Sequence, residues 1–361
     1  MKLNHKLFAP MRAAARALMR RTPATTAEAF QQALDNATAL QRAARRMVDQ
    51  ASTPPRAPAQ PAADLLGAID LPHEVPRPEA RTGLPGQFSD GAFTNEAGTR
   101  GYKLYVPSTY HGQPVPLLVM LHGCTQDPDD FAKGTQMNVL AEELPCIVVY
   151  PAQSQQANPS RCWNWFNEID QQRDHGEPSI IAGITRHIIA THAVDAGQVY
   201  VAGLSAGGAM ATIMGTLYPD LYAAVGVHSG LPFAAADDLP SALAAMKGDF
   251  KRRHVPGRAL PLIVFHGDQD KVVHPAASDE LIAQGTMPLS KSSVAEPGQV
   301  PDGHAYTRTL HHRDDGNVHA EHWLVHGGGH AWFGGSADGS YTDARGPDAS
   351  REMLRFFRTQ R

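Results

Sequence analysis

Ser205 is the residue whose type and setting first suggest chemistry, because it lies between two glycines at residues 203–207, GLSAG. An apolar run at residues 199–202 comes directly before this segment, and a run of small residues at 208–214 follows it. A serine at a junction of strand and helix is held in a strained turn, and its hydroxyl is exposed there as a nucleophile requires. Side chains in place of the two glycines would collide with neighbouring elements. We therefore predict that Ser205 is a nucleophile.

A serine hydroxyl is a poor nucleophile near neutral pH, so Ser205 needs a histidine base that is oriented by a carboxylate. Two later loops supply these groups in the chain order Ser, Asp, His. Asp270 follows the apolar run at residues 260–265, and His330 lies in a glycine-rich loop after the run at 320–325. Because parallel strands end at one edge of a sheet, we expect the three side chains to meet there.

Both partner positions have rivals. Asp268 competes with Asp270, although an aspartate in such a turn often bonds its own backbone. The rivals of His330 are His266, His322 and His326. We expect His326, which ends the predicted strand, to be structural.

Acyl transfer also needs donors for the developing oxyanion, and two backbone N–H groups are candidates. One belongs to Ala206, directly after the predicted nucleophile. The other belongs to Cys124, because the apolar run at 118–121 leads into His122, Gly123 and Cys124. His122 precedes the nucleophile, which is the wrong order for the base, and we expect it to order this loop.

From residue 87 onward, apolar runs alternate with helix-like segments. The predicted strands are 100–106, 116–121, 146–150, 198–202, 223–227 and 260–265, with a late hairpin of 306–310 and 320–325. The predicted helices are 131–143, 180–191, 206–217 and 347–359. This alternation predicts an α/β fold with a mostly parallel central sheet flanked by helices.

The chain before this domain has a different composition. We predict an N-terminal helical arm at residues 1–51, a Pro/Ala-rich linker at 52–86 and a catalytic domain at 87–361. The arm carries arginines on one face and could contact a partner or an apolar surface such as a lipid or polymer. It lacks an uninterrupted apolar core of a signal peptide, which favours a cytoplasmic location.

Composition excludes several other functions. The net charge of −4 over 361 residues gives no basic surface for nucleic acid. No apolar run reaches the roughly eighteen residues of a transmembrane segment. The 18 histidines do not form a helical metal-binding motif, and hydrolysis by a triad needs no metal or organic cofactor.

Of the three cysteines, Cys146 lies in an apolar run and is expected to be buried, whereas a Cys124–Cys162 disulfide is a hypothesis.

Five motifs in order carry a resemblance to the PHB depolymerase-family esterases, which are α/β-hydrolases related to feruloyl and acetyl xylan esterases. They are 121–126 (LHGCTQ), 162–166 (CWNWF), 203–209 (GLSAGGA), 266–270 (HGDQD) and 329–332 (GHAW), and the resemblance covers about residues 87–358. It implies that Ser205 is the nucleophile, Asp270 the acid, His330 the base and Cys124 part of the oxyanion loop. Members of this family are often extracellular.

The substrate expected from this resemblance is a carboxylic ester, in the first place short-chain poly(3-hydroxybutyrate) or its oligomers. Feruloyl or acetyl esters of plant polysaccharides are the alternative, and a non-catalytic granule- or surface-binding protein is an alternative of another class. Three tryptophans are expected beside the sheet edge where the triad meets: Trp163, Trp165 and Trp332. They are either an apolar platform for substrate or part of the packing.

Overall fold

The computed structural model describes residues 85–250, 259–286 and 292–360. The predicted helical arm at 1–51 and all but the last two residues of the linker lie outside the described residues. Among the described helices, none combines the length and apolar character needed to cross a membrane.

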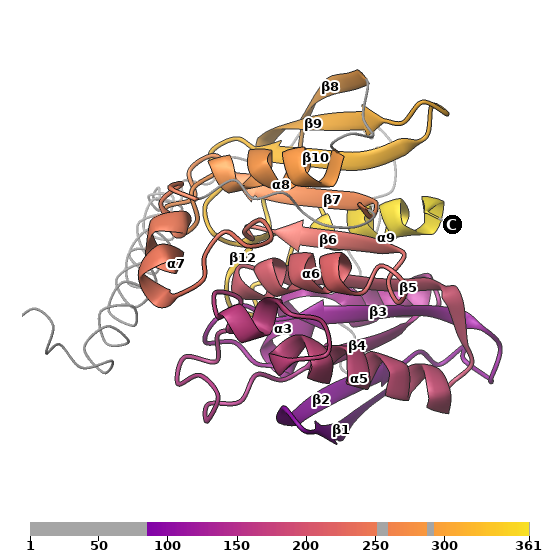
Figure 1. Ribbon diagram of the computed structural model, residues 1–361. Helices are drawn as coiled ribbons and strands as arrows, with labels where there is room; N and C mark the ends of the chain where they lie inside the picture. Colours follow the sequence, from indigo (N-terminus) through magenta and orange to yellow (C-terminus); the bar gives the residue numbers. More distant parts are fainter. Residues whose placement is uncertain (1–84, 251–258, 287–291, 361) are drawn as a thin grey trace, which may run out of the picture. The chain divides into compact units, whose positions relative to one another are not determined.

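A ten-stranded sheet in the order β1-β2-β4-β3-β5-β6-β7-β10-β9-β8 forms the centre of the described part (Figure 1). Its strands are β1 (Gln87–Asn95), β2 (Gly98–Val106), β3 (Val115–Leu121), β4 (Ile147–Pro151), β5 (Val194–Leu204), β6 (Ala224–His228), β7 (Leu262–Gly267), β8 (Ser292–Gln299), β9 (Ala305–His312) and β10 (Val318–Val325). The six strands from β4 to β10 in this order are parallel, and both edges are antiparallel. The mostly parallel sheet and the hairpin of β9 and β10 are therefore confirmed.

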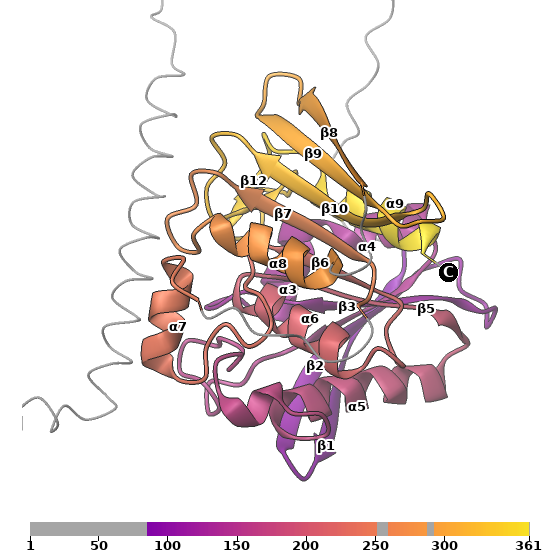
Figure 2. The same cartoon turned by 45° about the horizontal axis from the view of Figure 1, so that its top comes forward.

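Helices cover both faces of this sheet (Figures 1 and 2). Helices α5 (Gly176–Thr191), α6 (Ala206–Leu217) and α8 (Ala276–Thr286) lie on one face, and α4 (Met137–Glu143) and α9 (Ala349–Thr359) lie on the other. The remaining elements are α3 (Pro128–Thr135), η1 (Glu168–Gln171), α7 (Leu239–Met246) and the short strands β11 (Trp332–Phe333) and β12 (Thr342–Asp343).

The central strands are apolar on both faces because helices bury both faces. All residues of β4, β6 and β7 are buried, which explains why their sequences are continuous apolar runs. On the α9 side, the ring of Phe357 stacks on that of Tyr200 from β5, with centroids 4.8 Å apart. Residues of α9 such as Met353 and Phe356 are fully buried, so its apolar face closes this side of the core.

Two features differ from the sequence-based expectation. The helix predicted at 131–143 is two helices, α3 and α4, because Gln136 between them takes a left-handed conformation with φ 54°. Strands β1 and β8 and helices α7 and α8 were not predicted. Both strands lie at sheet edges, where polar residues on exposed positions weaken the apolar pattern of a strand.

Candidate active site

Ser205 lies at a sharp turn between β5, which ends at Leu204, and α6, which begins at Ala206. Its backbone has φ 57° and ψ −118°, a conformation that is rare for a residue with a side chain. The Ser205 N–H donates to the carbonyl of His228 at 2.9 Å and holds the turn against the end of β6. The predicted strained turn is confirmed.

The flanking glycines are required because backbone passes directly over them. A Cβ atom at Gly203 would overlap the carbonyl of Gly207 in the first turn of α6. A Cβ atom at Gly207 would overlap the carbonyls of Leu121 and His122. The end of β3 is therefore packed on the first turn of α6, and the loop that starts at His122 begins beside Ser205.

Strand register brings the other predicted triad segments to the same edge. Leu204 of β5 pairs with His228 of β6, which pairs with Phe265 of β7, and Val325 of β10 pairs with Gly267 of β7. The loops after β7 and β10 also contact each other directly, since the Gln269 N–H donates to the Gly328 carbonyl at 3.0 Å.

Asp270 and His330 form a buried hydrogen-bonded pair between these two loops. Asp270 Oδ2 lies 2.7 Å from His330 Nδ1, and each residue is only 6% exposed. Asp270 Oδ1 accepts from the N–H groups of Val272 at 2.8 Å and Val273 at 2.9 Å, which fixes the carboxylate. An Nδ1–H that donates to Asp270 leaves the basic lone pair of the imidazole on Nε2.

The Asp270 carboxylate is stabilised in its ionised form. Burial raises its pKa, but the charge of His330 and the hydrogen bonds from His266 and His330 outweigh burial, so the pKa lies well below its usual range. The His266 Nε2–H donates to the Val273 carbonyl at 2.9 Å and lies 3.3 Å from Asp270 Oδ2. His266, expected as a rival base, therefore helps to orient the acid.

The other rivals have structural partners. Asp268 Oδ1 accepts from the Gly327 N–H at 2.8 Å, and its Oδ2 lies 3.1 Å from His326 Nδ1. Asp268 thus ties the two loops together, which is a structural role. His326 also contacts Thr307 Oγ1 at 2.9 Å, as expected of a structural residue. His322 Nε2 lies 2.9 Å from Ser278 Oγ on α8.

His122 orders the loop after β3, as predicted. Its ring is 1% exposed, and Nε2 accepts from the Gln153 N–H at 3.0 Å. The proton of the neutral ring must then lie on Nδ1, which donates to the Gly123 carbonyl at 2.8 Å. Burial lowers the pKa of His122 to about 4, so this arrangement persists at neutral pH.

The hypothesised disulfide is present, since Cys124 is bonded to Cys162. It joins the loop after β3 to the segment that carries the CWNWF motif. Cys146 is free and 2% exposed, and burial raises the pKa of its thiol to about 12. It is the buried core thiol that we expected.

Of the two expectations for the tryptophans, substrate platform or packing, the structure shows packing for Trp163 and Trp332. Trp163 is 0% exposed and lies beside His122, with ring centroids 5.7 Å apart. Trp332 is 1% exposed, meets Phe131 edge to face at 5.5 Å and donates from Nε1 to Ser350 Oγ at 3.0 Å. Both rings fill the core under the loops, where substrate has no access. Trp165 is 6% exposed and also packs on an aromatic ring, that of Phe166.

His228 is a functional candidate that sequence reasoning missed. It is fully buried at the end of β6, and its Nε2 accepts from the Phe333 N–H at 3.0 Å, just after His330 in the chain. Its carbonyl accepts from the Ser205 N–H, so one residue contacts both the serine turn and the histidine loop. Burial, together with the nearby His266 and His330, lowers its pKa well below the usual range. The one sequence signal for His228 is its position directly after the apolar run at residues 223–227.

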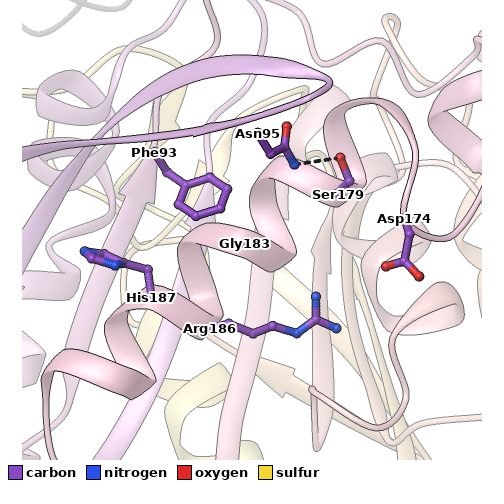
Figure 3. A pocket seen from close by; sticks show the side chains of 7 residues that line it. All are labelled: Phe93, Asn95, Asp174, Ser179, Gly183, Arg186 and His187. Carbon is purple, nitrogen blue, oxygen red and sulfur yellow. Dashed lines mark hydrogen bonds between the residues drawn. The ribbon is translucent and has the colours of Figure 1, made fainter.

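Two surface hollows lie outside this constellation. One, of about 480 Å³, is formed by residues of β1, of α5 and of the loop that leads into α5 (Figure 3). In it the Phe93 ring lies over Gly183, and the Asn95 side chain donates to Ser179 Oγ. The other, of about 620 Å³, runs along β1, β2 and the start of α3. Neither is lined by Ser205, Asp270 or His330. In the described ranges, no group of three His, Cys, Asp or Glu side chains is placed to hold a metal ion.

The mostly parallel sheet, the serine turn after β5 and the Asp–His pair after β7 and β10 define an α/β-hydrolase. A solved structure with this fold, the acetyl xylan esterase from Aspergillus awamori, matches 74% of this chain and 98% of its own with a TM-score of 0.59 and 19% identity. Residues 100–289 match the family described as esterase PHB depolymerase, and the chain belongs to this family. The match includes Ser205 and Asp270, and His330 lies beyond it.

Two curated relatives illustrate the range of this likeness. Poly(3-hydroxyalkanoate) depolymerase C from Paucimonas lemoignei is 34% identical over 208 residues, which cover 54% of this chain and 49% of the relative. Feruloyl esterase B from Thermothelomyces thermophilus is 28% identical over 217 residues, which cover 55% of this chain and 73% of the relative. The match therefore spans about half the length of the depolymerase.

Proposed function

We propose that this protein is a serine esterase that hydrolyses carboxylic esters through an acyl-enzyme. The observation that carries the proposal is the buried Asp270–His330 pair at the sheet edge where the strained Ser205 turn also lies. Membership of the esterase PHB depolymerase family supports it. An intact set of nucleophile, base and acid also favours catalysis over a non-catalytic surface-binding role.

The side chains have distinct roles in this mechanism. His330 Nε2 accepts the proton of Ser205 Oγ as the oxygen attacks the ester carbonyl, and Asp270 stabilises the imidazolium that results. The N–H groups of Cys124 and Ala206 stabilise the oxyanion of the tetrahedral intermediate. His330 then protonates the leaving alcohol. Water attacks the acyl-enzyme by the same route, returns Ser205 and releases the acid.

We propose short-chain polyhydroxyalkanoate, as polymer or 3-hydroxybutyrate oligomers, as the main substrate, because one relative is named a poly(3-hydroxyalkanoate) depolymerase. A second candidate is a feruloyl or acetyl ester of a plant polysaccharide, because other relatives are named feruloyl esterase B and acetylxylan esterase A. Rates measured in parallel on 3-hydroxybutyrate oligomers, methyl ferulate and acetylated xylan separate the two candidates. The hydroxybutyrate preference predicts the highest kcat/KM on the oligomers.

The esterase activity itself is tested by measuring hydrolysis of p-nitrophenyl butyrate by the wild-type chain and by Ser205→Ala. The proposal predicts hydrolysis by the wild type and its loss in the variant. Undiminished hydrolysis by Ser205→Ala would remove the assignment of the nucleophile.

We further propose that the catalytic domain spans residues 87–361 and that the arm at 1–51 contacts a polymer or partner surface. Deletion of residues 1–60 tests this role. It should weaken sedimentation with polyhydroxybutyrate granules while kcat on p-nitrophenyl butyrate stays unchanged. Undiminished sedimentation would exclude a polymer-anchoring role.

A further inference from the structure

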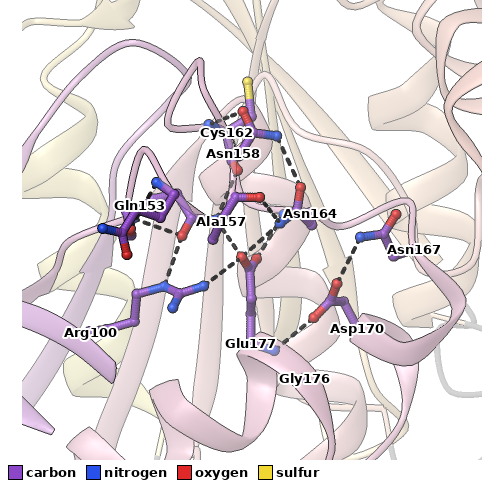
Figure 4. Close-up of polar contacts among 12 residues, drawn as sticks. Arg100, Gln153, Ala157, Asn158, Cys162, Asn164, Asn167, Asp170, Gly176 and Glu177 are labelled. Carbon is purple, nitrogen blue, oxygen red and sulfur yellow. Dashed lines mark hydrogen bonds and ion pairs between the residues drawn. The ribbon is translucent and has the colours of Figure 1, made fainter. Parts of the chain in front are cut away.

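A buried polar cluster, which the mechanism above does not use, contacts the loop that carries Cys124. Its centre is Glu177 in the first turn of α5, together with Gln153 just after β4 and Arg100 of β2 (Figure 4). Glu177 and Gln153 are each 4% exposed and Arg100 is 7% exposed. One strand, one helix and one loop thus bring polar side chains into the interior, where an unpaired polar group is costly.

Glu177 is the acceptor for every other member of this cluster. Its Oε1 accepts from Arg100 Nη2 at 3.1 Å, from Asn164 Nδ2 at 2.9 Å and from Gln153 Nε2. Its Oε2 accepts from the Asn164 N–H at 2.7 Å. A buried ion pair whose hydrogen bonds are satisfied admits little freedom of geometry, so it is a rigid anchor.

Two connections lead from Gln153 to the loop at residues 122–124. In the first, Gln153 Nε2 donates to the carbonyl of Cys162 at 2.9 Å, and Cys162 is covalently bonded to Cys124. In the second, the Gln153 N–H donates to His122 Nε2 at 3.0 Å, and His122 Nδ1–H donates to the Gly123 carbonyl at 2.8 Å. Both connections end within one residue of the Cys124 N–H, the proposed oxyanion donor.

We infer that Glu177 and Gln153 are positioning residues that hold residues 122–124 in the geometry needed for acyl transfer. The inference rests on the proposed function. An oxyanion donor acts only within about 2.7–3.1 Å of the developing charge, so a small shift of this loop weakens stabilisation of the transition state. Substrate binding depends much less on this contact, which is strongest in the transition state.

The test compares two buried carboxylates that accept from arginine. Glu177→Gln should lower kcat on p-nitrophenyl butyrate about tenfold or more while KM changes less than about twofold. Glu321→Gln is the matched control, because Glu321 is 1% exposed and accepts from Arg308 at 3.0 Å and Arg355 at 2.6 Å on β9 and α9. Its kcat per folded molecule should match the wild type.

A second variant avoids leaving Arg100 without its counter-ion. Gln153→Met removes the side-chain bonds of Gln153 to Cys162, Glu177, Arg100 Nε and the Ser154 N–H. It keeps the Arg100–Glu177 ion pair and the Gln153 N–H. Gln153→Met should lower kcat with little change in KM. The same substitution should lower kcat by a smaller factor in a chain in which Cys124 and Cys162 are both replaced by Ser. That loss of additivity follows because the bond from Gln153 to Cys162, unlike its bonds to Glu177 and Arg100, acts on Cys124 through the disulfide. Gln284→Met, which removes side-chain bonds from α8 to Phe233, is its control.

Thermal melting first establishes that each variant is folded. The inference is overturned if folded Glu177→Gln has the kcat of Glu321→Gln, or if Gln153→Met has the kcat of Gln284→Met. If Glu177→Gln does not fold, Gln153→Met decides alone. Failure of the proposed function is seen separately, as a wild-type chain without esterase activity or a Ser205→Ala variant that retains it.

Discussion

Replacing Asp270 by Asn tests the assignment of the acid at the level of single atoms. The amide oxygen can still accept from the N–H groups of Val272 and Val273, as Asp270 Oδ1 does at 2.8 and 2.9 Å. The amide nitrogen then occupies the position of Oδ2, 2.7 Å from His330 Nδ1. Because an amide nitrogen only donates, His330 must carry its proton on Nε2 and cannot accept the proton of Ser205.

We expect Asp270→Asn to lower kcat by about 10⁴-fold, which corresponds to about 5 kcal/mol of transition-state stabilisation. Asp268→Asn is the matched control, since Asp268 contacts Gly327 and His326, whereas Asp270 contacts His330. Its kcat should fall by less than about tenfold, as for a residue that only ties loops together. The assay is steady-state hydrolysis of p-nitrophenyl butyrate by variants shown to be folded by circular dichroism. The assignment of Asp270 as the acid is refuted if the kcat of Asp270→Asn stays within tenfold of the wild type, or if Asp268→Asn has the lower kcat.

Three other perturbations have expected outcomes. Burial lowers the pKa of His122 and His322 to about 4, so the unfolded chain takes up these protons first as pH falls. The free energy of unfolding should therefore decrease between about pH 6.5 and 4 by up to about 3 kcal/mol per histidine; urea titrations that show constant stability there would contradict this. Gly207→Ala should lose most activity and at least about 2 kcal/mol of stability, because its Cβ overlaps the Leu121 carbonyl; a melting temperature equal to the wild type's would count against this packing. Reduction of the Cys124–Cys162 bond should lower both kcat and stability, the latter by about 2–4 kcal/mol, whereas unchanged values in dithiothreitol would show that the disulfide does not support the loop.

The sequence was informative where a local pattern has one structural solution. The GLSAG segment predicts the turn at Ser205 because its two glycines meet backbone that no side chain could approach. The buried parallel strands were readable as continuous apolar runs, since both faces of the sheet are covered. The order of Ser205, Asp270 and His330 along the chain, combined with the rule that parallel strands end at one edge, was enough to predict their segments' common location.

Long-range packing explains what the sequence could not show. Trp163 and Trp332 have the residue type and position of a substrate platform, and only the three-dimensional contacts show that both rings are buried. Gln136 breaks the helix predicted at 131–143 although its residue type favours helices. Glu177 and Gln153 come from separate elements, 24 residues apart, and no local motif marks their meeting.

Direct capture of the acyl-enzyme tests whether Ser205 is the residue that carries the acyl group. The chain is mixed with p-nitrophenyl butyrate, quenched in acid during the first turnovers, digested and mapped by mass spectrometry. We predict a butyryl group on Ser205 in the wild type and none at this position in Ser205→Ala. A butyryl group on another residue, with Ser205→Ala still hydrolysing the ester, would contradict this prediction.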